Sequence, residues 1–526
     1  MKTLPIIIYV GTALFLLACS RVESERIPIS TKSAESRALF WEGMSLCERF
    51  HLDAAREKML AAIELDSEFA LGYLGLAMCE LNHGAQAATL QQADELSRPV
   101  ASKVAPSIIL GINVLEDRNE ELIGHAGKLM NKVSPGERLW ISGTRCLLES
   151  NLDGAAANFE KLASMYPNDP LAHKLLGDCY LRFEDASKAV PAYQRALTLD
   201  STRVCIYNTL GYEYQLLGET AKAEEMFRLY AHYLPNEPNP LDSYGEFLLR
   251  NGRYEESLEQ YRRALEIDSH FMNARVGVAT NLIMLRRHED ARREIRQQML
   301  VSQSTAELDA LLLMSALSFL YQGQPAQCLE ELNVRAQYLN AATDPVTVAQ
   351  NLNIRGEVLS LMGRYDEAER EFLQSTELLR RSKLPNTLKE NNNLHHEIRL
   401  ALYVDVPQGN FAAAERKLNN VDVICSVLPV SLNRSKLETM LHALRGAIAL
   451  GKKDYQFALQ EFSLGNRNSA ATAYFEGIAY EGMEENEKAS ECFKSALQIR
   501  RLFDLPHALV YNNAKAALER LSRPVA

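Results

Sequence analysis

Small and large apolar residues recur every 34 residues through the middle of the chain. One position is small in five successive periods: Gly143, Gly177, Gly211, Gly245 and Ala279. A second small residue follows twelve positions later: Ala155, Ala189, Ala223, Ser257 and Ala291. A large apolar residue stands four positions further on: Phe159, Tyr193, Phe227, Tyr261 and Ile295. Polar breaks such as 217–219 separate the two small positions, so the pattern predicts pairs of antiparallel helices.

The same positions predict how these helices pack. Small residues let the first helix of a hairpin (helix A) approach the second (helix B), and we expect the large residue to fill the groove of the next hairpin. One hairpin cannot bury both of its apolar faces. We therefore expect the hairpins to stack into an elongated solenoid rather than to form separate globular domains.

The repeating residues resemble the tetratricopeptide repeat. The unit 204–237 carries the motif at seven positions: Tyr207, Leu210, Gly211, Tyr214, Ala223, Phe227 and Pro235. It departs at Tyr230, where the family has Ala, and the unit 170–203 has Ser201 in place of the terminal Pro. The resemblance implies an all-α fold, a right-handed superhelical solenoid of antiparallel helix hairpins.

The sequence predicts four segments along the chain. We expect a signal peptide over 1–18, a polar tether over 19–33, and a regular 34-residue array over 34–304 that is degenerate at 85–135. From 305 to 526 the spacing is looser, which indicates longer helices. A polar-faced capping helix is expected over 505–523, since solenoids need a solvated end.

The first twenty residues indicate export. A short apolar stretch follows Lys2 and ends in Leu16-Leu17-Ala18-Cys19, which resembles the lipobox of bacterial lipoproteins. The resemblance implies cleavage before Cys19 and lipidation of that residue. A general secretory signal or an uncleaved anchor are the alternatives, and both still export the protein. Ser20 after the Cys is similar to the outer-membrane default, so we expect a lipid-anchored envelope protein facing the periplasm.

Composition changes this picture only in part. Hydrophobic residues make up 47% and charged residues 24%, which is typical of a soluble globular protein and excludes a disordered chain. The net charge of -11 opposes nucleic acid as a partner. Eight cysteines remain after Cys19, scattered singly with no CxxC, and we expect buried thiols rather than a disulfide framework. These are Cys47, Cys79, Cys146, Cys179, Cys205, Cys328, Cys425 and Cys492.

Motifs with a local chemical mechanism are missing from the sequence. No Gly-rich phosphate loop, GxSxG, HExxH or EF-hand loop occurs, so we expect no catalytic residues, no metal and no cofactor. His395 and His396 are the one pair that suggests a metal. Adjacent residues on a helix point about 100° apart, so we interpret this pair as part of a polar helix start.

A repeat array without catalytic motifs is typical of a binding protein. The resemblance implies that helix A lines the concave face, where we expect a protein or peptide ligand. The residues transferred to this groove are Glu137, Trp140, Thr144, Lys174, Asp178, Arg182, Asn208, Tyr212, Gln215, Asn239, Asp242, Glu246 and Arg250. Acidic Asp242 and Glu246 disfavour a clamp for a C-terminal carboxylate. Trp140 and Trp41 could be ligand platforms, but both lie on the first helix of a unit, near the place where the motif prefers an aromatic for packing, so we expect them to pack in or near the core.

Three functions therefore compete. The leading hypothesis is a membrane-anchored scaffold that binds other proteins in the bacterial cell envelope. The alternative is a glycan-binding surface lipoprotein of the starch-utilisation type, although such proteins use long aromatic-rich loops and aromatic residues here are only 8%. A hydrolase hidden in the irregular C-terminal part is the third, and no nucleophile there is paired with a base.

Overall fold

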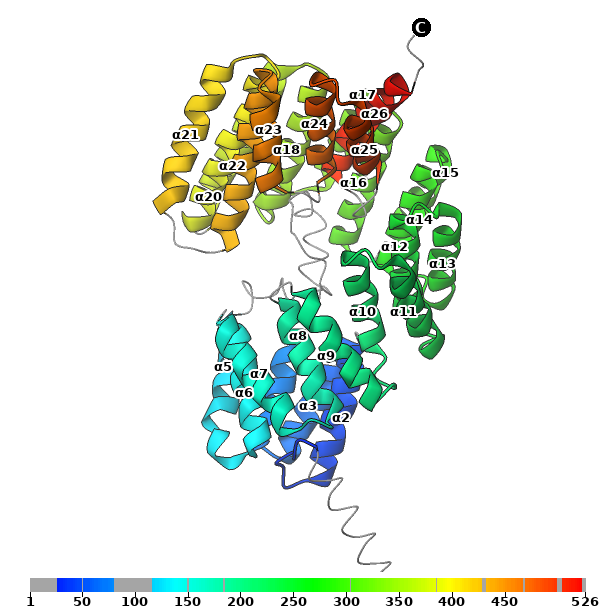
Figure 1. Ribbon diagram of the computed structural model, residues 1–526, viewed down its shortest axis with the longest axis vertical. Helices are drawn as coiled ribbons and strands as arrows, with labels where there is room; N and C mark the ends of the chain where they lie inside the picture. Colours follow the sequence, from blue (N-terminus) through cyan, green and yellow to red (C-terminus); the bar gives the residue numbers. More distant parts are fainter. Residues whose placement is uncertain are drawn as a thin grey trace, which may run out of the picture. The chain divides into compact units, whose positions relative to one another are not determined.

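The computed structural model describes most of the chain. The described ranges are 26–49, 51–79, 116–148, 151–182, 185–302, 304–384, 386–427, 432–466, 469–498 and 504–522. The predicted signal peptide and Cys19 lie outside them. Within these ranges the chain is helical with no strand, which confirms the predicted all-α tetratricopeptide solenoid (Figure 1).

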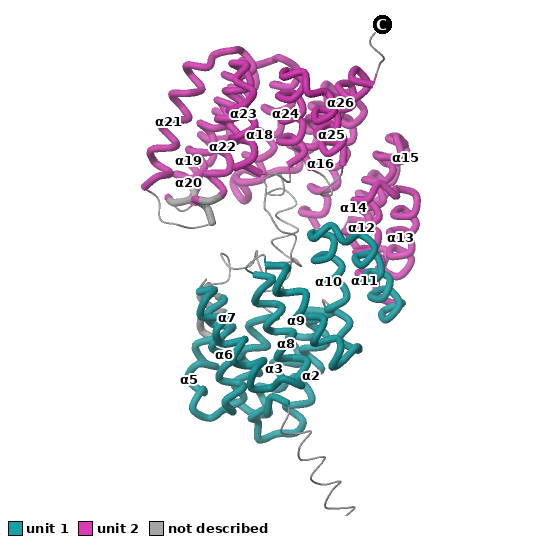
Figure 2. The backbone as a smooth tube through the Cα atoms, in the orientation of Figure 1, with its two compact units in different colours: residues 1–89, 102–235 teal, residues 90–101, 236–526 magenta. Residues whose placement is uncertain are grey.

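Two compact units make up the chain (Figure 2). Unit 1 holds 1–89 and 102–235, and unit 2 holds 90–101 and 236–526. The division thus falls after Pro235, whereas spacing predicted a change near 300–305. Helix length varies after residue 305, since α16 (Thr305–Tyr321) has 17 residues but α23 (Tyr455–Leu464) has 10, compared with 13 in α12 (Pro238–Arg250).

Unit 1 is a row of helix hairpins. Its helices are α2 (Ala34–Glu48), α3 (Leu52–Leu65), a helical segment over 70–79, α5 (Glu116–Lys128), η3 (Met130–Lys132), α6 (Pro135–Leu148), α7 (Leu152–Met165), α8 (Pro170–Arg182), α9 (Ala186–Leu199), α10 (Cys205–Leu216) and α11 (Thr220–Tyr233). Helices α2 and α3, α6 and α7, α8 and α9, and α10 and α11 pack as antiparallel pairs. One buried apolar cluster runs from Ile27 to Cys179.

Glycines on helix A make room for aromatic rings on helix B of the same hairpin. A Cβ on Gly177 would lie 2.7 Å from the Tyr193 ring, and a Cβ on Gly356 would lie 2.4 Å from the Phe372 ring. We expected the large residue to fill the next hairpin. Tyr261 does contact the next hairpin at Gly277, but it lies against Gly245 of its own hairpin as well. Each ring therefore packs between helix A and helix B of its own hairpin, and any contact with the next hairpin is additional.

Unit 2 continues the hairpins. After α12 come α13 (Tyr254–Ile267), α14 (Met272–Met284), α15 (His288–Met299), α16, α17 (Pro325–Tyr338), α18 (Pro345–Leu361), α19 (Tyr365–Arg381), α20 (Asn386–Leu400), the π turn η4 (Ala401–Asp405), α21 (Phe411–Val427), α22 (Leu432–Gly451), α23 (Tyr455–Leu464), α24 (Ala470–Gly482), α25 (Asn486–Leu497) and α26 (Leu505–Leu521). No helix in the described ranges is long and apolar enough to cross a membrane.

The last helix returns to an earlier part of unit 2. We expected α26 to cap the array with a solvated face, but it packs on α24, α25 and also α16. The Tyr321 hydroxyl lies 2.9 Å from His507 Nδ1, and Asn512 Nδ2 donates to the Leu320 carbonyl at 2.7 Å. Successive helices from α16 to α26 thus form a closed circuit of neighbours.

Residues 26–33 are bound to unit 1, although we expected them to belong to a polar tether. Ile27 is buried, with its N–H donating to Asp169 Oδ2 at 2.7 Å. Ser30 donates to Glu137, and the Thr31 hydroxyl donates to Asp66. We call residues 26–33 the N-terminal strap. Sequence reasoning missed it because the acceptors are distant in the chain.

The cysteines and the histidine pair have buried or partly buried positions. The eight cysteines of the described ranges form no disulfide with one another, and five of them are buried: Cys47, Cys79, Cys179, Cys328 and Cys425. His395 and His396 are buried as well, so α20 does not begin with the solvated pair that we expected. Burial lowers the pKa of His396 to about 4. Among the described residues no group of three or more His, Cys, Asp or Glu is arranged to hold a metal ion.

Candidate functional site

The residues predicted to line a groove divide between the two units. Trp140, Lys174, Asp178, Arg182, Asn208, Tyr212 and Gln215 belong to unit 1, and Asn239, Asp242, Glu246 and Arg250 belong to unit 2. Each set is described separately.

Trp140 is not available to a ligand. Its side chain is 1% exposed and lies in the core of unit 1, with its ring centroid 6.2 Å from that of Phe40. Trp41 is partly buried and packs edge-on against Phe40 at 5.1 Å. Both tryptophans, one on α6 and one on α2, are thus used for packing. Glu137, transferred to the groove with Trp140, is instead fully buried and accepts hydrogen bonds from the strap.

A stripe of polar side chains follows α8. Lys174, Asp178 and Arg182 are spaced four residues apart, so they share one face of the helix. Lys174 Nζ lies 2.8 Å from Asp178 Oδ2, and the Tyr193 hydroxyl donates to Asp178 Oδ1 at 2.8 Å. Both partners of the ion pair keep less than a fifth of their side chain exposed. Tyr193 therefore packs against Gly177 and also orients the acid of the stripe.

Glu48 joins this stripe to the beginning of α10. Its Oε1 lies 3.8 Å from Lys174 Nζ and 3.9 Å from Arg203 Nη1. Burial would lower the pKa of Lys174, but the charges of Asp178 and Glu48 raise it above its ordinary value. Two acids thus compensate two bases, which leaves a neutral, pre-organised polar surface. The repeat pattern offers no signal for Glu48, because it lies more than a hundred residues from Lys174.

The face continues along α10 with amides and an aromatic ring. Asn208 is 8% exposed, and its Oδ1 is buried without a hydrogen-bond partner among the described residues. Tyr212 is half-buried and packs edge-on against Phe227 at 5.0 Å, and Gln215 is half-buried one turn further on. A buried amide oxygen without a partner costs about 1–3 kcal/mol. A ligand that donates a hydrogen bond to Asn208 would recover this energy.

In unit 2 the predicted residues lie on α12. Glu246 and Arg250 form an ion pair at 2.5 Å, with side chains 17% and 14% exposed. Asp242 is buried and Asn239 is half-buried. These side chains share one helix face, as the transferred positions predicted, but the pair is already satisfied internally.

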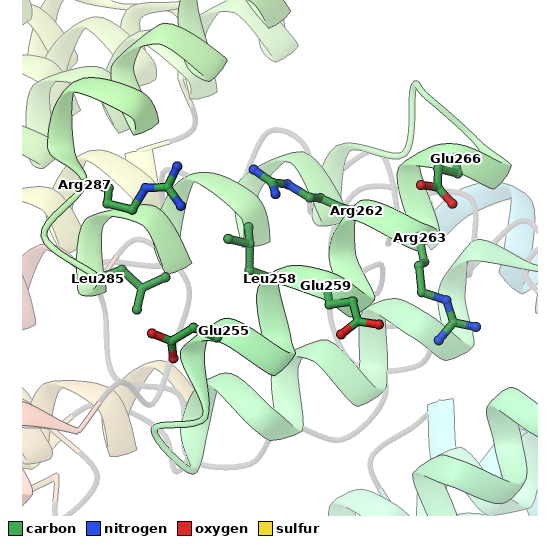
Figure 3. A pocket seen from close by; sticks show the side chains of 8 residues that line it. All are labelled: Glu255, Leu258, Glu259, Arg262, Arg263, Glu266, Leu285 and Arg287. Carbon is green, nitrogen blue, oxygen red and sulfur yellow. The ribbon is translucent and has the colours of Figure 1, made fainter.

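A shallow hollow of about 420 Å³ lies elsewhere on unit 2, over α13 and the turn between α14 and α15 (Figure 3). Leu258 and Leu285 contribute its apolar part, and the remaining lining is charged: Glu255, Glu259, Arg262, Arg263, Glu266 and Arg287. These charged side chains are exposed and of both signs. The hollow therefore has the character of a solvated helix B surface, not of an enclosed site.

Comparisons with known proteins agree with the helical pattern. A family model described as a tetratricopeptide repeat matches 149–203, and a second matches 241–271. The general transcriptional corepressor trfA of Dictyostelium discoideum is 27% identical over 154 residues, which is 29% of this chain and 11% of that protein. This chain therefore spans only a small part of that relative.

Solved structures give a similar result. A tetratricopeptide repeat protein from Parabacteroides merdae is 17% identical with a TM-score of 0.38, over 49% of this chain and 96% of that one. PilF of Pseudomonas aeruginosa is 19% identical with a TM-score of 0.29, over 40% and 93%. At these values the likeness says nothing of function. The two family matches fall on helix hairpins of the 34-residue pattern, and the chain contains tetratricopeptide repeats.

Proposed function

We propose that this protein is a lipid-anchored scaffold of the bacterial cell envelope, and that it binds a protein partner on the helix A face of unit 1. Tetratricopeptide repeats support a role in protein–protein interaction. The observation that carries the choice of face is Asn208, whose buried amide oxygen lacks a partner beside Tyr212 and Gln215. We name the surface formed by Lys174, Asp178, Arg182, Asn208, Tyr212 and Gln215 the α8–α10 face.

The chemistry of this face suits an extended peptide or a partner helix. Amides supply hydrogen bonds to a backbone or to polar side chains, and Tyr212 supplies a rigid apolar contact. Lys174 and Arg203 pair with Asp178 and Glu48, so these four side chains carry no net charge. Arg182 is the one further charge of the α8–α10 face, so a strongly charged ligand is disfavoured. The activity is binding rather than catalysis.

The α8–α10 face is tested by site-specific photo-crosslinking in membranes. A photo-reactive residue in place of Tyr212 is expected to capture a defined protein partner. The same residue in place of Lys222, which is 58% exposed on α11, is the control and is expected to capture none. Asn208→Ala is expected to reduce the Tyr212 product several-fold. No partner in native or cross-linked samples would contradict the scaffold.

Anchoring has its own test. Metabolic labelling with a fatty acid is expected to mark the wild-type chain and not Cys19→Ala, which should leave the membrane fraction. Signal cleavage places Cys19 first in the mature chain, and its acyl chains would supply the two hydrophobic signals that stable attachment requires. Unlabelled, uncleaved wild-type protein would contradict lipidation and leave the binding test unaffected.

The glycan-binding alternative is less well supported, since Trp140 is buried and Trp41 packs against Phe40. Binding to a glycan array that is lost in Trp41→Ala would revive it.

A further inference from the structure

The N-terminal strap crosses one edge of unit 1. Each hairpin ends in a turn that joins helix B to helix A of the next, and we call the row of these turns the B–A edge. Its turns precede the helical segment at 70–79, α6, α8 and α10. The strap meets the first three of these turns in order, with Lys32 at Asp66, Ser30 at Glu137 and Ile27 at Asp169.

The acids that hold the strap are fixed by their own turns. Asp66 also accepts from the Glu68 N–H, Glu137 from the Ser134 N–H, and Asp169 from the Leu171 N–H. Burial alone would raise the pKa of Asp66, but hydrogen bonds from Thr31 and Lys32 hold it below its ordinary value. The three carboxylates are therefore pre-formed acceptors for the strap.

Apolar and ionic contacts complete the binding of the strap. Ile27 is 6% exposed, and its Cγ2 would lie 3.0 Å from a Cβ on Gly136, so the side chain sits directly on the first turn of α6. The Ser134 hydroxyl donates to the Pro28 carbonyl at 2.8 Å. Lys32 pairs with Glu68 at 2.7 Å. Contacts to three turns fix both the position and the direction of the strap.

The bound strap leaves only residues 20–25 between itself and Cys19. Six residues separate Cys19 from Arg26, and an extended chain spans at most about 3.5 Å per residue, so this connection reaches about 25 Å. If the strap were free, the connection would extend to α2 and reach about twice as far. A short connection attached along one edge limits how unit 1 can turn relative to its attachment point.

We propose that the B–A edge of unit 1 faces the membrane surface and that the opposite edge, formed by the turns from helix A to helix B, faces away from it. This inference rests on the proposed lipidation of Cys19. The helices of unit 1 run between the two edges, and 14 residues of α7 correspond to about 20 Å. The strap is thus an orienting device, and the B–A edge is a surface for a lipid bilayer.

Helix α7 offers a matched pair of positions for the test. Asp153 lies in its first turn and Ser164 in its last, and both are exposed. The eleven-residue offset places them on the same helix face, about 16 Å apart along the axis. A fluorescent amino acid is introduced at either position in the full-length lipidated protein. Energy transfer is then measured to an acceptor lipid in phosphatidylethanolamine–phosphatidylglycerol vesicles.

Transfer from position 164 is expected to exceed that from position 153 severalfold. A flexible insertion of about 15 residues between Glu25 and Arg26 keeps the strap bound and lengthens the connection, so the difference should shrink towards none. Equal transfer from both positions, or stronger transfer from 153, would overturn the proposal.

A second variant tests the strap itself. Glu137→Ala combined with Ser30→Ala removes the central contacts of the strap, and the difference between the two positions is again expected to fall. A preserved difference would show that the strap does not orient the unit. Mass analysis of Cys19 separates the failures, because an unmodified Cys19 overturns the proposed anchoring as well, whereas a lipidated chain without asymmetry overturns only the orientation.

Discussion

Arg335 donates to both carboxylate oxygens of Asp309, from Nε at 2.8 Å and from Nη2 at 2.7 Å. The guanidinium is fully buried, and Nη1 donates to Asn351 Oδ1 at 3.1 Å. One side chain on α17 thereby holds α16 and α18. Removing one partner of a buried pair leaves an uncompensated charge or acceptor.

We expect Arg335→Ala to lower the free energy of unfolding by about 3–5 kcal/mol. Chemical denaturation of the protein, followed by a spectroscopic signal from unit 2, would measure this loss. Arg364→Ala is the matched control, because its bidentate partner Glu367 is equally close but both side chains are more than 40% exposed, and little or no loss of stability is expected. A loss at Arg335 no larger than the control would contradict the structural role of the pair.

The glycines of helix A give a second prediction. Gly356→Ala places a methyl group 2.4 Å from the Phe372 ring, so the hairpin must open, and we expect a loss of about 1–3 kcal/mol. Gly124→Ala, at an exposed position of α5, meets no atom of the described residues within 4 Å, and higher helix propensity should stabilise the variant by up to about 1 kcal/mol. Thermal unfolding of both variants would show opposite shifts of Tm, and shifts of the same sign would count against the packing argument.

The repeat pattern predicted the hairpins because the contacts within a hairpin join residues that are close in the sequence. Gly177 and Tyr193 lie sixteen residues apart, so their contact follows from the period. The closure of Tyr321 on His507 and the pairing of Glu48 with Lys174 join residues over a hundred positions apart. Nothing in a 34-residue period encodes such contacts. For this reason the fold followed from the sequence, while the strap and the partners of Lys174 did not.

Aromatic identity held information that the pattern did not use. The 34-residue pattern requires only a large ring at this position, so Phe159 and Phe227 satisfy it as well as Tyr193 does. The hydroxyl of Tyr193 donates a hydrogen bond to Asp178. A tyrosine at a position where phenylalanine would fill the same space was therefore the signal in the sequence for a polar contact. Trp140 stands at a position that the resemblance assigns to the groove, yet its side chain packs in the core against Phe40.

Glu213 gives a prediction for pH. Its side chain is 2% exposed on α10, and burial raises its pKa to about 7 from 4.5. Between these values the unfolded chain ionises the carboxyl while the folded chain keeps it protonated, so stability falls as pH rises, by up to about 3 kcal/mol. The stability is fully present below pH 4.5 and its loss is complete above pH 7.

Glu213→Gln should remove this dependence. At pH 8 the variant is expected to be more stable than wild type by about 2–3 kcal/mol, and at pH 4 nearly equal to it. Urea denaturation at the two pH values measures the difference. Glu225→Gln on exposed α11 is the control and should change stability by less than about 0.5 kcal/mol at either pH. A Glu213→Gln variant that tracks wild type at both values would refute burial of the carboxyl.

The docking of α26 gives a fourth prediction. Asn512→Ala leaves the Leu320 carbonyl without its donor and should cost about 1–2 kcal/mol. The exposed neighbour Asn513→Ala is the control, with less than about 0.5 kcal/mol expected. Hydrogen exchange of α16 amides should speed up in Asn512→Ala and not in Asn513→Ala. Unchanged exchange in both would mean that α26 does not protect α16.

The return of α26 to α16 changes how the second half of the chain can come apart. A linear row of repeats frays from its last hairpin, and each lost hairpin exposes only one interface. In the circuit from α16 to α26 the last helix already has neighbours on two sides. Detaching any hairpin there breaks two interfaces at once, so the hairpins of this circuit are expected to melt together.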